Sequence, residues 1–167
     1  MNQKMALVWA LAFLAAVGYL WFIQGALPDH LAVHFDINGK PNGFQSKADF
    51  GVMFFGFIFL MNGLFLFLFW GVDRLPVRNL NMPWKKYWFA NEERKVLAFE
   101  KLRSVLALVG IFLCTTFFIT EHIIYQANAA NPWFVFPING GVAVILLLSL
   151  LVIGFSITLT KPPVKDA

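Results

Sequence analysis

Charged residues are scarce in this sequence. Only 13% of the chain is Asp, Glu, Lys or Arg, whereas about a quarter of an ordinary soluble protein is charged. Hydrophobic residues make up 59% of the chain and aromatic residues 17%. The single cysteine, Cys114, excludes an intramolecular disulfide and a CxxC metal or redox motif. These proportions exclude a typical soluble domain and indicate an integral membrane protein.

The sequence also lacks the short motifs of common enzyme classes. It contains no HExxH, no glycine-rich phosphate loop and no GxSxG, and no histidine or lysine is arranged around its serines. The net charge of +4 is concentrated beside apolar runs rather than along one exposed face. We therefore predict that the protein is not an enzyme, that it has no catalytic residues and that it binds no nucleic acid.

Four apolar runs are long enough to cross a bilayer. Residues 5–26 would extend about 33 Å as an α-helix, and the hydrocarbon core of a bilayer is about 30 Å thick. Further spans are predicted at about 50–72, 103–125 and 138–160, the third preceded by an amphipathic helix that Asn91 caps. The predicted fold class is all-α: a single membrane domain over residues 1–167, with four transmembrane helices.

Two features of these runs have alternatives. The first run could be a cleaved signal peptide, but it is long for one and no A-x-A site precedes Leu27, so we expect an uncleaved helix. Asn62 lies in the middle of the second span, where an unpaired amide is costly, so we expect it to make an interhelical hydrogen bond. A transport role for Asn62 is the alternative.

Basic residues are distributed unevenly among the loops, which predicts the orientation in the membrane. Only Lys40 and Lys47 lie in the loop of residues 27–49, whereas the N-terminal flank, the region around loop 73–102 and the C-terminal tail contain all the others. Cytoplasmic loops retain lysine and arginine. Both termini and loop 73–102 are therefore predicted to be cytoplasmic, and loop 27–49 is predicted to be extracytoplasmic.

The extracytoplasmic loop contains strand and turn signals. Leu31, Val33 and Phe35 alternate with small or polar residues, which is the periodicity of a strand. Asn38-Gly39 is a strong hairpin signal, and the segment 41–43 (Pro-Asn-Gly) predicts a second turn. We expect a short extended or hairpin-like cap on the helices.

Histidines and carboxylates gather on the predicted outer side, because the third span places Glu121 and His122 at the outer interface or slightly inside it. Imidazole and carboxylate groups are ligands for zinc and similar divalent ions. One hypothesis is therefore a ligand or metal site where the cap meets the helices, formed by His34 and Asp36 with either His30 or the pair Glu121 and His122. In the alternative, the chain holds no cofactor, His34 bonds the backbone of the cap and Glu121 makes an interfacial contact with a lysine.

The cytoplasmic loop interleaves aromatic and basic side chains. Aromatic rings favour the headgroup layer of a bilayer, and cations favour anionic lipids. The loop is therefore predicted to contact anionic headgroups or, in the alternative, to dock a membrane or cytoplasmic protein partner. A further expected interaction is the association of several copies of the chain into a homo-oligomer. The residues are Trp84, Lys85, Lys86, Tyr87, Trp88, Arg94 and Lys95.

The outer loop also resembles a known family. Leu27-Pro28, His34-Phe35, Asn38-Gly39 and Ser46-Lys47 resemble the signature of a bacterial membrane domain of unknown function, DUF1648. The same domain forms the N-terminal part of Sdp-type toxin-immunity and signal-transducing membrane proteins, and the loop from residue 81 to residue 94 resembles compact members of the family. We expect the chain to be too short for the additional C-terminal membrane domain of the immunity proteins.

This resemblance implies a multi-pass protein of the bacterial inner membrane and supplies no catalytic residues. We expect a non-enzymatic component of envelope sensing, signalling or immunity. The alternative is a metal- or small-molecule-binding subunit of a membrane transport assembly.

Overall fold

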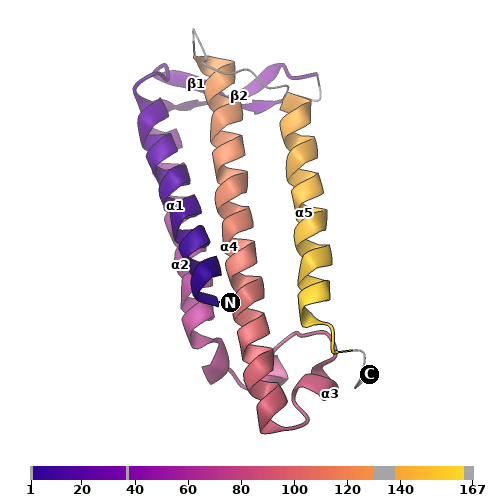
Figure 1. Cartoon of the computed structure of the whole chain (residues 1–167). Coiled ribbons are helices and arrows are strands. Elements are labelled where there is room, and N and C mark those ends of the chain that lie inside the picture. The colour runs from indigo at the N-terminus through magenta and orange to yellow at the C-terminus, as the bar shows by residue number, and fades with distance from the viewer. Residues whose placement is uncertain (1, 37, 130–137, 164–167) are drawn as a thin grey trace.

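Four long helices dominate the protein. The computed structural model describes residues 2–36, 38–129 and 138–163. The long helices are α1 (Asn2–Gln24), α2 (Lys47–Gly71), α4 (Glu92–Asn128) and α5 (Ile138–Thr160), and they run side by side in one bundle (Figure 1). Within the described residues, each is long and apolar enough to cross a membrane. The prediction of a mostly helical membrane protein with four spanning helices is confirmed.

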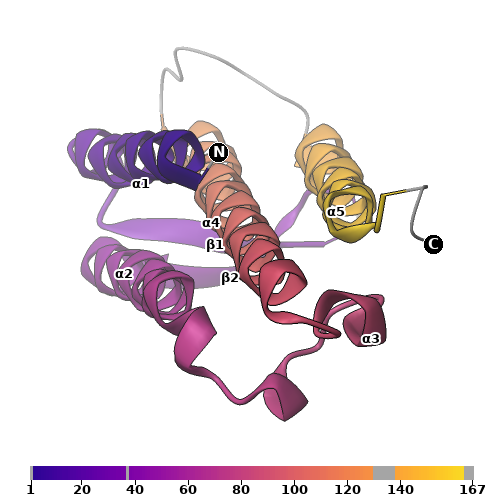
Figure 2. The same ribbon diagram turned by 60° about the horizontal axis from the view of Figure 1, so that its bottom comes forward.

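α4 is the central helix, and α1, α2 and α5 all pack against it (Figure 2). It contains 37 residues. The side-chain oxygen of Asn91 accepts a hydrogen bond from the backbone N–H of Arg94 at 2.9 Å, which caps the first turn as predicted. The third span and the helical segment before it are therefore one continuous helix. Phe99 is buried in that segment, but Val96 and Leu97 are exposed, so the expected apolar stripe is only partly used for packing.

α1 approaches α4 closely at one glycine. The indole of Trp9 lies against Gly110, where a Cβ atom would be only 2.1 Å from Cε2 of the ring. Ala107 and Cys114, one turn to either side of Gly110, are also buried against this ring. Small residues at a helix interface allow this approach, which is a common way for helices to pack in a membrane.

A hairpin lies across one end of the bundle (Figure 1). Its strands β1 (His30–Phe35) and β2 (Pro41–Ser46) are antiparallel. The turn is stabilised by Asp36, whose Oδ1 accepts hydrogen bonds from the backbone N–H groups of Asn38 and Lys40 at 2.9 and 2.8 Å. Gly39 adopts a φ of 77°, which a glycine adopts without strain. The hairpin signal in Asn38-Gly39 therefore predicts the turn correctly.

Two details of the hairpin differ from the prediction. The segment 41–43 belongs to β2 and is not a second turn. Register shifts between Ala32 and His34 and between His34 and Phe35 interrupt the simple alternation of β1, and Leu31 and Ala32 are both buried. A bulge places neighbouring side chains differently from a regular strand.

The opposite end of the bundle is closed by short elements: η1 (Val72–Arg74), η2 (Val77–Asn79) and α3 (Lys85–Trp88). The indole N–H of Trp88 donates to the backbone oxygen of Thr160 at 2.7 Å, and the ammonium of Lys101 donates to that of Leu159. These donors satisfy carbonyl groups at the end of α5 that have no partner within the helix. The segment 128–132 (Asn-Ala-Ala-Asn-Pro) predicts a short turn before the fourth span, with Trp133 as an interfacial anchor. Trp133 and most of this turn lie outside the described residues.

Candidate functional site

A carboxylate is buried inside the bundle, in the half of α4 nearest the hairpin. The side chain of Glu121 is 0% exposed. Neither of its carboxylate oxygens has a hydrogen-bond partner among the residues that the structure describes. An ionisable group inside a membrane span is costly, and such groups commonly mark functional sites. Glu121 is therefore the centre of the candidate site.

The residue next to Glu121 connects α4 to α1. Tyr19 Oη and His122 Nδ1 lie 2.6 Å apart and share a hydrogen bond. The ring of Tyr19 also packs on Phe118, with ring centroids 4.5 Å apart, and the ring of His122 lies 6.0 Å from that of Tyr125. Aromatic contacts and one hydrogen bond thus join the two helices beside the buried carboxylate.

A second polar contact lies deeper in the bundle and involves three helices. Oδ1 of Asn62 in α2 accepts hydrogen bonds from Nε1 of Trp9 in α1 at 2.8 Å and from Sγ of Cys114 in α4 at 3.1 Å. Its amide nitrogen donates to the backbone oxygen of Ile58 at 2.8 Å. Asn62 therefore makes the interhelical contacts expected of it, and this geometry indicates a packing role.

The last residue of α4 holds the hairpin. Asn128 accepts a hydrogen bond from the backbone N–H of Ala32 at 2.7 Å and donates to its backbone oxygen at 2.8 Å. The same amide group donates to the backbone oxygen of Ile124 at 2.8 Å. Because Asn128 lies two helical turns beyond Glu121, one helix connects the buried carboxylate to the hairpin.

Replacement of Asn128 by alanine is expected to loosen the hairpin, because both backbone groups of Ala32 lose their partner. The loss of two hydrogen bonds should cost about 1–3 kcal/mol locally, which corresponds to roughly tenfold or greater acceleration of amide exchange. Hydrogen exchange at the Ala32 amide measures this effect. Asn79→Ala, at an exposed position, is the control. Unchanged exchange at Ala32 in Asn128→Ala would contradict the contact.

The predicted metal site is not assembled. His30 is exposed and pairs with Ser46 in the hairpin, the ring of His34 packs against Gly43, and Asp36 bonds the turn. Among the described residues, no three His, Cys, Asp or Glu side chains lie close enough to hold a metal ion. The hairpin register separates His30, His34 and Asp36 from Glu121 and His122. The expected surface contact of Glu121 with a lysine is also absent from the described part of the chain, because the carboxylate lies inside the bundle.

The aromatic and basic loop is largely used within the fold. Trp88 is buried at 2% exposure, which removes it from the predicted set of membrane anchors. The ring of Tyr87 lies under the guanidinium of Arg94, 4.1 Å from its centroid, and Lys85 donates to the backbone oxygen of Leu80 at 2.9 Å. Lys95 pairs with Glu92 at 3.2 Å.

Two members of the set remain on the surface. Trp84 is 43% exposed and Lys86 is exposed. Trp84 also has a positive φ of 53°, which is uncommon for a bulky residue. Of the seven predicted contact residues, Trp84 and Lys86 are therefore the best placed to meet a lipid headgroup or a partner.

One comparison with known families gives a match. Residues 10–61 match the model of a domain of unknown function, DUF1648. This segment is a DUF1648 domain. It comprises most of α1, the hairpin and the first part of α2. It contributes Tyr19 to the candidate site, whereas Glu121 and His122 lie beyond the DUF1648 segment. No curated protein and no solved structure matches the chain.

Sequence reasoning missed two polar residues of α1, Tyr19 and Gln24. Both lie in a run that was interpreted only as a membrane span. A signal was present, since a tyrosine and a glutamine are polar groups in the half of the first span next to the outer loop. Their partners on other helices could not be read from the same run, because helix contacts join distant parts of the sequence.

Proposed function

We propose that this protein is a non-enzymatic component of the bacterial inner membrane that acts in envelope sensing, signalling or immunity. The observation that carries the proposal is the fully buried carboxylate of Glu121, which has no hydrogen-bond partner among the described residues. A buried ionisable group without a partner costs free energy, so its presence favours a functional role over a packing role.

The surroundings of Glu121 suggest how a signal would be transmitted. Because the side chain is fully buried, a cation or hydrogen-bond donor can reach it only if α4 moves relative to the elements packed around it. A movement of α4 away from α1 would lengthen the 2.6 Å contact between Tyr19 and His122. It would also displace the end of α4, where Asn128 holds the hairpin. Occupation of the site would therefore change the position of the hairpin.

The orientation is part of the same proposal. α1 begins and α5 ends at the end of the bundle away from the hairpin (Figure 1), which supports termini on one side of the membrane. The excess of lysine and arginine around loop 73–102 supports a cytoplasmic position for that side. The hairpin would then face outward, and Trp84 and Lys86 would meet anionic headgroups or a cytoplasmic protein. The resemblance of the outer loop to DUF1648, a domain that also forms the N-terminal part of Sdp-type proteins, is the support for an immunity role.

Complementation in bacterial cells tests this function. Survival after challenge with membrane-active peptides and expression of envelope-stress genes would be compared in cells with and without the protein. We expect the wild type to change at least one of these responses and Glu121→Leu, present at equal abundance, to abolish the change. Glu100→Gln removes an exposed carboxylate from the same helix and should behave as the wild type. Identical responses with and without the protein, or full activity of Glu121→Leu, would refute the proposal.

A small-molecule-binding subunit of a transport assembly is the second candidate. An open groove of about 940 Å³ between α1 and α2 supports it. Chemical crosslinking in native membranes separates the two candidates, because this second role requires transporter subunits to be crosslinked to the protein. The metal-binding form of this hypothesis is not retained, since the described residues form no metal site.

A further inference from the structure

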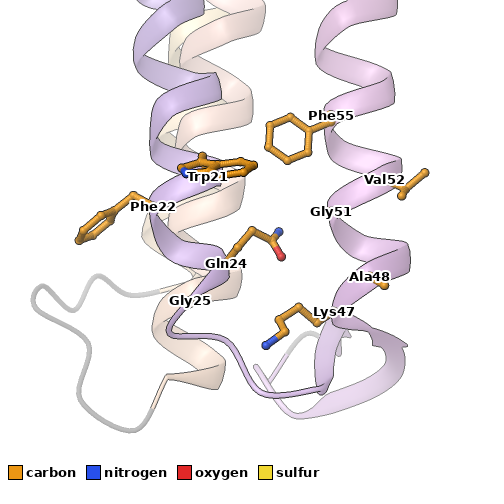
Figure 3. Close-up of a pocket in the computed structure, with 9 residues that line it drawn as sticks. All are labelled: Trp21, Phe22, Gln24, Gly25, Lys47, Ala48, Gly51, Val52 and Phe55. Atoms are coloured by element: carbon orange, nitrogen blue, oxygen red, sulfur yellow. The ribbon is translucent and has the colours of Figure 1, made fainter.

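A groove opens between α1 and α2 at the hairpin end of the bundle (Figure 3). Its volume is about 940 Å³. Trp21 from α1 and Val52 and Phe55 from α2 supply apolar lining. The side chains of Gln24 and Lys47 point into the space between the two helices, nearer the hairpin (Figure 3). One end of the groove is therefore polar and the rest is apolar. Such a groove is complementary to an amphiphilic ligand, which has a polar head and an apolar tail.

The polar end offers hydrogen-bond donors. Nε2 of Gln24 is buried and has no hydrogen-bond partner among the described residues. Gly51 allows the amide to lie against α2, because a Cβ atom there would be 3.2 Å from Nε2. The ammonium of Lys47 donates to the backbone oxygen of Leu27 at 3.1 Å, which leaves capacity for further acceptors. The amide of Gln24 and the ammonium of Lys47 can each donate a hydrogen bond to a phosphate oxygen.

A carboxylate lies beside these donors. Oδ1 of Asp29 is 3.5 Å from Nζ of Lys47, and the two side chains are 92% and 33% exposed. Such an exposed ion pair is weak, so both charges are available to a ligand. The mouth of the groove therefore presents both signs of charge and is not a purely cationic surface.

The apolar part has a defined depth. The rings of Phe13 and Phe59 make an edge-on contact 5.3 Å apart, which joins α1 and α2 below the groove. The lining residues of α2 run from Lys47 to Phe55, which is about 12 Å at 1.5 Å per residue. One leaflet contributes about 15 Å to the hydrocarbon core. The groove is therefore short enough to lie within one leaflet, which would place its polar end near the headgroups.

We propose that this groove binds an aminophospholipid, a lipid whose headgroup combines a phosphodiester with a primary ammonium. The phosphate would accept hydrogen bonds from Lys47 and Gln24, and the ammonium would donate to Asp29. A purely anionic headgroup would place its charge beside Asp29 without an ammonium to pair with that carboxylate. A trimethylammonium headgroup cannot donate hydrogen bonds to the carboxylate. All of the proposed contacts lie within the DUF1648 segment and are independent of Glu121.

Native mass spectrometry of the purified, delipidated full chain tests the proposal. The probes are phosphatidylethanolamine, phosphatidylglycerol and phosphatidylcholine with identical acyl chains. We expect the wild type to bind phosphatidylethanolamine about fivefold or more tightly than the other two, the difference that one charge-assisted hydrogen bond would produce. Equal binding of the three lipids, or tighter binding of phosphatidylglycerol, would overturn the proposal.

Three variants locate the site. Lys47→Met should lower binding of phosphatidylethanolamine about fivefold or more, and Asp29→Asn should remove its preference over phosphatidylglycerol. Lys40→Met, at an exposed lysine of the hairpin turn, is the control and should bind as the wild type. Because Lys47 also contacts Leu27, Lys47→Arg tests whether a cation restores both folding and binding. Unchanged lipid preference in Lys47→Met and Asp29→Asn, with helical content retained, would place the lipid elsewhere and refute the assignment.

Discussion

Replacement of Gly110 by alanine is expected to lower the free energy of unfolding by about 2–3 kcal/mol. The new Cβ atom would lie 2.1 Å from Cε2 and 2.5 Å from Nε1 of Trp9, far inside van der Waals contact. The indole cannot simply move away, because its N–H donates to the buried Asn62 at 2.8 Å. Either this hydrogen bond breaks or α1 separates from α4. Thermal unfolding in detergent, followed by circular dichroism, measures the loss.

Gly154→Ala is the matched control, because it places the same methyl group in another spanning helix with no atom within 4 Å. Its stability should be unchanged or raised by up to about 1 kcal/mol, since alanine favours a helix more than glycine does. Trp9→Leu combined with Gly110→Ala should lose less stability than the sum of the two single changes. If Gly110→Ala unfolds at the same temperature as Gly154→Ala, the close packing of α1 on α4 is wrong.

Replacement of Glu121 by leucine is expected to raise the free energy of unfolding by about 1–3 kcal/mol. The two side chains are similar in size, and an apolar group in place of an unpaired buried carboxyl group removes the desolvation cost of that polar group. The same unfolding measurement applies, with the exposed Glu100→Gln as a control that should show no change. A more stable protein that has lost its activity is the expected result when a group serves function rather than folding.

A loss of stability in Glu121→Leu would lead to a different conclusion. Truncation of a satisfied buried charge typically costs several kcal/mol, about 3–5 when its partner is left alone. Such a result would mean that Glu121 has a partner beyond the described residues or in a second molecule. Glu121→Gln separates charge from shape, because it keeps the side-chain length and removes the ionisable group.

The spanning helices could be predicted because their signal is local. A long apolar run can satisfy its backbone in a bilayer only as a helix, so length and hydropathy are sufficient to locate the spans. The hairpin turn was predictable for a similar reason, since Asn38-Gly39 favours a tight turn in any context. The register shifts in β1 were not predictable, because a pattern of alternating residues does not show where the pairing of two strands shifts.

The candidate site depends on contacts between distant segments, and there sequence reasoning was less successful. Glu121 was predicted to lie at the outer interface or slightly inside it, whereas α4 continues to Asn128 and that carboxylate is fully buried in the bundle. Trp88 was assigned to the membrane surface because aromatic residues gather there. Its burial follows from the end of α5, whose Thr160 carbonyl accepts its N–H. Sequence patterns identified Glu121 and Trp88 as notable residues, but they did not show which distant segments pack against them.

The uninterrupted course of α4 has a mechanical consequence. A helix of 37 residues is about 55 Å long and behaves as a stiff rod. A change of about 10° in its tilt around the middle would move each end by about 5 Å, in opposite directions. One end holds the hairpin through Asn128, and towards the other Arg103 pairs with Asp73 at 2.8 Å. If α4 tilts about its midpoint at Gly110, where it packs on Trp9, a displacement of the hairpin end would move the end near Asp73 in the opposite direction.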